Sequence, residues 1–144
     1  MSSFKVSLQY AHHALSENEE RWCTTGQDVL AFFDAFDWYD EVRKANQLRQ
    51  VSPTLSVEAG RPASLLWVSA VGDSARISFI SEYSFPADTS RLFGLWPGSG
   101  KRTLAVGAAG QGSFTLSQAR EAVALFTRRA HAELAVFYQL ARTQ

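Results

Sequence analysis

The chain has 144 residues, the length of one ordinary domain, with 46% hydrophobic and 19% charged residues, as is typical of a globular protein. Its 14 basic and 14 acidic residues cancel, which excludes a strong overall field that would attract nucleic acid. A lone cysteine, Cys23, excludes an internal disulfide framework and a zinc site built on a cysteine cluster. We therefore expect a single domain over residues 1–144.

The first residues, MSSFKVSLQY, contain no apolar run of the length of a signal peptide. No segment of the chain approaches the roughly 18 consecutive apolar residues that a membrane-spanning helix needs. We expect a cytoplasmic protein that makes no contact with membranes.

Residues 4–10 (FKVSLQY) alternate apolar and polar side chains, and this period of two predicts a half-buried first strand. After an acidic loop, residues 23–47 change to helical periodicity, and Thr24 or Thr25 can cap the start of this helix. Its apolar side consists of Val29, Phe32, Phe33 and Phe36. We predict an amphipathic helix whose apolar side packs on the core.

Three extended runs follow, separated by segments whose Gly, Pro and Asp residues favour turns. They lie at residues 53–59, 64–71 and 75–83. The runs predict an antiparallel meander, with a bulge at Ile80 needed to place the apolar residues of the third run on one face. Residues 91–97, and either 103–107 or 112–116, can add further short strands.

Thr115 and Gln118 have the spacing of a capping box, and apolar residues recur at steps of three and four from Leu116 to Ala141. This stripe predicts one long C-terminal helix. The order of the elements favours an α+β fold: an antiparallel β-sheet meander packed on one face by the early amphipathic helix and the long C-terminal helix.

The segment GLWPGSGKRT, residues 94–103, has a partial likeness to a phosphate-binding loop. Such a loop requires Gly, four residues and then Gly-Lys-Ser/Thr at the start of a helix. Here Gly94 lies one place too early, and Arg102 follows Lys101 where Ser or Thr is required. We interpret the segment as a turn between strands and expect no cofactor.

The scarce histidine and cysteine residues do not indicate a reaction centre. His12 and His13 are adjacent, so in a strand they would point to opposite faces and could not bind one metal ion. Cys23 lacks the sequence context of an activated thiol, which favours a small buried side chain. We expect no metal site and no catalytic residues, and a small hydrolase or transferase built around residues 17–23 and the histidines stays open as an alternative.

Carboxylates are concentrated in residues 17–41, which hold eight acidic residues and one basic residue, whereas residues 42–144 carry twelve basic and six acidic residues. The carboxylates on the side of the predicted first helix away from its apolar residues are Asp34, Asp37 and Glu41, with Asp40 nearby and Trp38 at the border. Two interpretations stay open: a solvated helix surface, or an anionic docking face with a tryptophan anchor for a basic partner.

A second candidate surface lies at Phe93, Leu95 and Trp96, just before the glycine-rich turn. A tryptophan before Pro-Gly is typical of packing at the edge of a core, and contact with a partner is the alternative.

The predicted elements follow one another in a particular order: an early helix, hairpin strands over residues 54–83, an aromatic-glycine loop RLFGLWPG and the segment GSFTLSQAREAVALF. This order, over about residues 26–130, resembles the small immunity proteins of bacterial polymorphic and contact-dependent toxin systems. The resemblance implies a protein without enzymatic activity that binds one cognate toxin domain, often a nuclease or a deaminase, and blocks its active site.

The expected partner is therefore a cognate protein toxin with a basic surface, without direct contact between this chain and nucleic acid. The expected contact residues are Asp34, Asp37, Trp38, Asp40 and Glu41, followed by Phe93, Leu95 and Trp96. A phage-type or regulatory module that inhibits another nucleic-acid enzyme is the alternative function.

Overall fold

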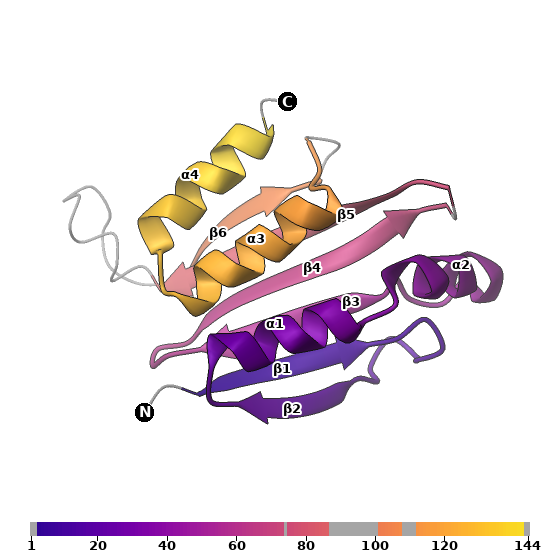
Figure 1. The fold of residues 1–144 in the computed structure, drawn as a ribbon, viewed down its shortest axis with the longest axis horizontal. Coiled ribbons are helices and arrows are strands. Elements are labelled where there is room, and N and C mark those ends of the chain that lie inside the picture. The colour runs from indigo at the N-terminus through magenta and orange to yellow at the C-terminus, as the bar shows by residue number, and fades with distance from the viewer. Residues whose placement is uncertain (1–2, 74, 87–100, 108–111, 143–144) are drawn as a thin grey trace.

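The computed structural model describes residues 3–73, 75–86, 101–107 and 112–142. Within these ranges the chain forms six strands and four helices in an α+β arrangement (Figure 1). None of the helices in the same ranges is long and apolar enough to cross a membrane.

The strands of the described residues form one antiparallel sheet in the order β2-β1-β3-β4-β5-β6. The strands are β1 (Phe4–Gln9), β2 (Glu19–Cys23), β3 (Thr54–Ala59), β4 (Ser64–Gly72), β5 (Ile77–Pro86) and β6 (Lys101–Val106). The helices are α1 (Gly26–Ala35), α2 (Trp38–Leu48), α3 (Leu116–Thr127) and α4 (His131–Arg142). The predicted meander is confirmed as β3, β4 and β5, and β1 joins it as the neighbour of β3.

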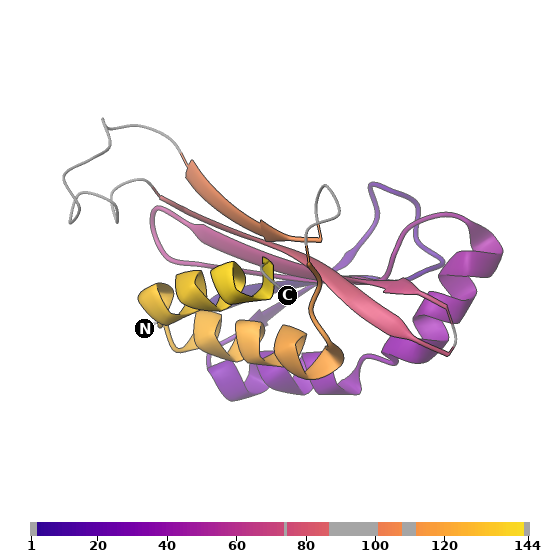
Figure 2. The same cartoon turned by 90° about the horizontal axis from the view of Figure 1, so that it is seen from above.

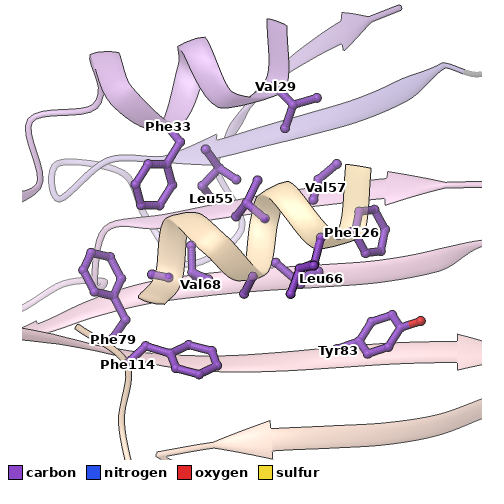
Figure 3. Close-up of a cluster of buried hydrophobic side chains, with 14 of the residues drawn as sticks. Val29, Phe33, Leu55, Val57, Leu66, Val68, Phe79, Tyr83, Phe114 and Phe126 are labelled. Carbon is purple, nitrogen blue, oxygen red and sulfur yellow. The ribbon is translucent and has the colours of Figure 1, made fainter. Parts of the chain in front are cut away.

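One face of the sheet carries the core. Alternate strand residues such as Leu55, Leu66 and Tyr83 are fully buried there, because α1, α3 and α4 lie along this face (Figure 2). Phe33 of α1 and Phe126 of α3 pack into the same apolar cluster (Figure 3). Each such side chain removed from water stabilises the fold by roughly 1.5–3 kcal/mol. The predicted α+β class, with helices on one sheet face, is confirmed.

The opposite face of the sheet has a mixed character. Lys5, Trp22 and Glu58 lie beside one another across β2, β1 and β3, because paired residues of antiparallel strands point to the same side. Trp67 and Glu82 form a similar pair on β4 and β5. Within the described residues no helix lies along this face (Figure 2), and of the side chains named here Trp22 is exposed while the other four are half-buried.

Two strand predictions were wrong in detail. The predicted acidic loop contains β2, a short edge strand whose Glu19, Glu20 and Arg21 lack the alternation that marks a half-buried strand. Charged residues are common on edge strands, because they disfavour pairing with another chain. The bulge expected at Ile80 is absent, since β5 pairs with β4 in continuous register and Ile80 lies on the face opposite the buried Phe79.

The single helix predicted over residues 23–47 is two helices. Thr25 caps α1 as expected, but α1 ends at Phe36, whose backbone is extended (φ −75°, ψ 123°). Asp37 then caps α2, its carboxylate accepting a hydrogen bond from the Asp40 N–H at 3.2 Å. The break lets Phe36 stack on Trp38 with ring centroids 4.1 Å apart, so both rings stay in the core while the chain changes direction.

The long C-terminal helix is also two helices, α3 and α4. Its predicted start is confirmed, because Thr115 and Gln118 form both hydrogen bonds of a capping box. The chain leaves the helix at Arg129, whose φ of 58° is left-handed, and α4 then lies beside α3 (Figures 1 and 2). The apolar stripe continues across this turn because both helices face the same core.

At one point the side chain of Thr127 in α3 packs directly against the backbone of α1, because Gly26 contributes no side chain of its own. A Cβ added to Gly26 would lie 2.7 Å from Thr127 Oγ1 and 2.9 Å from Thr127 Cβ. The start of α1 is therefore against the end of α3. At the opposite ends of the two helices, Asp34 pairs with Arg120, so the helices run antiparallel.

Candidate functional site

The predicted acidic residues do not share one helix face. Asp34 lies in α1, Asp37 is the cap of α2, and Asp40 and Glu41 are in the first turn of α2. The break at Phe36 separates these groups, so the projection onto a single helix was wrong. What each side chain can offer to a partner therefore has to be judged separately.

Trp38 was expected to be an exposed anchor, and this expectation was wrong. Trp38 is 4% exposed, and its ring stacks on Phe36 and makes an edge contact with Phe79. The indole Nε1 donates a hydrogen bond to the Phe33 carbonyl oxygen at 3.1 Å. With its ring buried and its donor satisfied, Trp38 holds the turn between α1 and α2 together.

Glu41 is also structural and not a surface contact. It is 7% exposed, and Oε1 accepts a hydrogen bond from the backbone N–H of Ala11 at 2.8 Å. The second carboxylate oxygen lies 3.4 Å from Lys44 Nζ. The carboxylate ties the loop after β1 to α2, so its predicted role in docking was wrong.

Asp40 remains at the surface, but cations of its own helix neutralise it. Arg43 and Lys44 both pair with the carboxylate, with Lys44 Nζ 3.2 Å from Oδ2. Hydrogen bonds from Arg43 and Lys44 hold the pKa of Asp40 below its ordinary value. The local charge at this point is close to zero or positive, which weakens its attraction for a basic partner.

Asp34 is paired across two helices. Arg120 of α3 donates to Oδ1 at 2.8 Å and to Oδ2 at 2.9 Å, a bidentate arrangement that lowers the pKa of Asp34. Both side chains are close to half exposed, at 51% for Asp34 and 46% for Arg120. Water competes with such an exposed pair, so it is worth at most about 1 kcal/mol.

These elements enclose a surface groove of about 360 Å³, here called the junction groove. It is lined by Phe33, Asp34, Phe36, Asp37, Trp38, Tyr39, Leu116, Ser117 and Arg120. The aromatic rings of Phe33, Phe36 and Trp38 are buried and belong to the core, whereas Tyr39 is 51% exposed. The groove therefore combines an apolar base with Asp34, Asp37 and Arg120.

The sequence reasoning missed Tyr39 and the three groove residues of α3. Asp37 followed by Asp40 has the spacing of a helix start, and this signal could have placed Tyr39 in the first turn of a new helix. Nothing local in the sequence pairs Asp34 with Arg120, which are 86 residues apart. The second predicted surface, Phe93, Leu95 and Trp96, lies outside the described residues.

Cys23 is buried, as predicted, and burial raises the pKa of its thiol. His13 also has a structural contact, because its Nδ1 accepts a hydrogen bond from the Tyr10 N–H at 3.0 Å. In the described ranges, no group of three or more His, Cys, Asp or Glu side chains is placed to hold a metal ion.

Lys101, Arg102 and Thr103 lie in β6, not at the start of a helix. A phosphate-binding loop would instead be followed by a helix at this point. Most of the glycine-rich segment, residues 94–100, is outside the described ranges.

Comparison with known proteins identifies no relative of this chain. No family model matches the chain, and no match was found among curated proteins or among solved structures.

Proposed function

We propose that this protein is an immunity protein that binds a cognate bacterial toxin domain with a basic surface and covers the active site of that domain in the cytoplasm. The junction groove is the proposed contact. The observation that carries the proposal is the combination, in one groove, of an aromatic base, the half-exposed Tyr39 and the two carboxylates of Asp34 and Asp37.

The apolar part of the groove suits a protein partner. Tyr39 presents a large, rigid ring with a polar tip, the kind of side chain that is enriched among residues that dominate binding energy. The buried rings of Phe33 and Trp38 below it fix the shape of the groove before binding. Little ordering is then needed on association, which favours affinity.

The charged part of the groove selects a basic partner. Because the ion pair between Asp34 and Arg120 is exposed, a lysine or arginine of the partner can replace Arg120 at low cost. Asp37 uses Oδ1 to cap α2, and its other carboxylate oxygen can accept a second hydrogen bond. Toxin domains that act on nucleic acid bind phosphates with basic residues, and carboxylates can occupy the same positions.

The test is co-expression with any toxin domain encoded beside the gene, followed by co-purification and measurement of affinity. Asp34→Asn, Asp37→Ser and Tyr39→Ala are combined, since serine keeps the helix cap and asparagine keeps the shape at Asp34. We expect the dissociation constant to rise at least tenfold, and the association rate to depend less on salt.

Glu121→Gln is the matched control. Glu121 is an exposed carboxylate of α3 that pairs with Arg128 and does not line the groove, so its loss is expected to leave binding unchanged. Failure to protect cells from the adjacent toxin, together with failure to co-purify with it, would contradict the immunity function. Binding that the triple variant does not change would place the contact elsewhere.

A further inference from the structure

The junction groove lies where α1 ends and α3 begins. A second hollow lies at the other end of this helix pair, where α1 begins and α3 ends. It consists of two adjoining pockets of about 510 Å³ and 260 Å³ that share Ala59, Gly60, Arg61 and Arg129. The turn between β3 and β4 meets the turn between α3 and α4 here, beside the end of β2. We call this hollow the basic cleft.

Cations dominate the lining of the basic cleft. Lys5, Arg61 and Arg129 line its larger pocket, and Glu58 is the carboxylate among the same lining residues. Lys5 is paired with Glu20 at 3.4 Å, but neither Arg61 nor Arg129 forms an ion pair with a described residue. Two guanidinium groups are thus available to an anion.

A flat ring borders these cations. Trp22 lines the larger pocket and is 70% exposed, an unusual position for the largest apolar side chain. An exposed indole beside a cationic hollow provides a surface on which a planar ring can stack, worth about 1–3 kcal/mol where a base stacks on an aromatic side chain. The pocket volume of about 510 Å³ is within the range of small-molecule sites.

We propose that the basic cleft binds a phosphate group carried by a planar ring, as in a nucleoside monophosphate. Arg61 and Arg129 bind the phosphate, because the planar guanidinium matches two of its oxygens at once. Trp22 stacks on the ring. Glu58 repels additional negative charge, so a monophosphate is preferred to a triphosphate. This site is independent of the proposed function, and its charge is opposite to that of the junction groove carboxylates.

The experiment is titration of the purified full chain with adenosine 5′-monophosphate at low ionic strength, followed by calorimetry and tryptophan fluorescence. The informative variant is Arg129→Gly. Arg129 has a left-handed backbone (φ 58°) that glycine adopts without strain, so this change removes the guanidinium while the fold is kept.

Arg49→Gly is the matched control, because Arg49 has the same left-handed conformation (φ 56°) at the end of α2. We expect Arg129→Gly and Arg61→Gln each to weaken nucleotide binding at least tenfold, and Arg49→Gly to leave it unchanged. Glu58→Gln is expected to strengthen binding, and Trp22→Leu to weaken binding of the nucleotide but not of inorganic phosphate.

Three further probes show which part of the ligand is recognised and whether it is a free nucleotide or a strand end. They are inorganic phosphate, adenosine and a short 5′-phosphorylated oligoadenylate. Tighter binding of the oligoadenylate would assign the site to a strand end, and tighter binding of the monophosphate to a free nucleotide. No binding of any phosphate probe, or equal losses in Arg129→Gly and Arg49→Gly, would overturn the proposal. Toxin binding is measured separately, so failure of one proposal leaves the other standing.

Discussion

At the residue scale, a side chain that looks available in the sequence can be fully engaged in the fold. Glu41 counts as a negative charge on an acidic segment, yet its carboxylate accepts the Ala11 N–H and is 7% exposed. Trp38 counts as an aromatic anchor, yet it lies in the core. Net charge along a sequence therefore overstates what a surface can present.

The role of Glu41 predicts a graded loss of stability. Glu41→Ala leaves the buried N–H of Ala11 without an acceptor, and we expect the free energy of unfolding to fall by about 2 kcal/mol. Glu41→Gln retains an acceptor oxygen, so the loss should be about 1 kcal/mol. Urea denaturation monitored by circular dichroism measures both values. Equal losses for the two variants would contradict the hydrogen bond as the cause.

At the element scale, the breaks in the two predicted helices create both proposed surfaces. The break at Phe36 allows α1 and α2 to form the junction groove with the start of α3. The turn at Arg129 places a guanidinium in the basic cleft.

The start of α2 depends on Asp37 as its cap. Asp37→Ala removes the side-chain acceptor for the Asp40 N–H and should lower the free energy of unfolding by about 1 kcal/mol. Asp37→Ser provides an alternative acceptor, so its stability should stay within a few tenths of a kcal/mol of the unchanged protein. Thermal and urea unfolding of both variants test this. A Ser variant as unstable as the Ala variant would show that the charge of Asp37 matters more than its cap.

At the scale of the whole molecule, α4 is joined to the sheet through polar contacts inside the apolar layer. The Tyr138 hydroxyl lies 2.6 Å from Ser81 Oγ of β5. Tyr83 of β5 hydrogen bonds to Nδ1 of His131 at the start of α4. These contacts fix the position of α4 against β5, because buried hydroxyl groups are costly to leave without partners.

This arrangement predicts that the stability of the whole domain depends on pH. Burial, followed by the nearby charge of Arg129, holds the pKa of His131 below its ordinary value of 6.5. Below pH 6.5 the unfolded chain therefore binds the proton more readily than the folded chain, and the free energy of unfolding falls as the pH decreases through this window. Above that pH the contribution of the neutral imidazole is complete.

Denaturant unfolding from pH 7.5 to 5.0 measures this effect, with His131→Gln as the comparison. The variant should lose less stability over this interval than the unchanged protein does. The pKa values of Asp34 and Asp40 lie below 3.8, so protonation of these two carboxylates lowers the free energy of unfolding only at a pH below the measured interval. Parallel pH profiles for the two proteins would contradict the assignment to His131.

Much of the fold could be predicted from the sequence because its signals are local. Alternation in residues 4–10 indicates β1, and the extended runs between turn-forming residues from 53 to 83 indicate β3, β4 and β5. The helix breaks escaped prediction because helical periodicity continues across Phe36 and Arg129. Of the candidate site, Asp34 and Asp37 could be found from charge alone. Tyr39 could have been found from the helix-start spacing of Asp37 and Asp40. Arg120 could not, since tertiary packing brings it to Asp34 from 86 residues away.

The close approach of Gly26 and Thr127 fixes the separation between the basic cleft and the junction groove. The Thr127 side chain fits only against the bare backbone of Gly26, so sliding α1 along α3 would bring a side chain of α1 into contact with it. The helix pair is a rigid spacer between the basic cleft and the junction groove, and the ten residues of α1 give it a length of about 15 Å. A bivalent compound whose linker spans this length would therefore find both surfaces at one fixed separation, which is the condition for a gain in avidity.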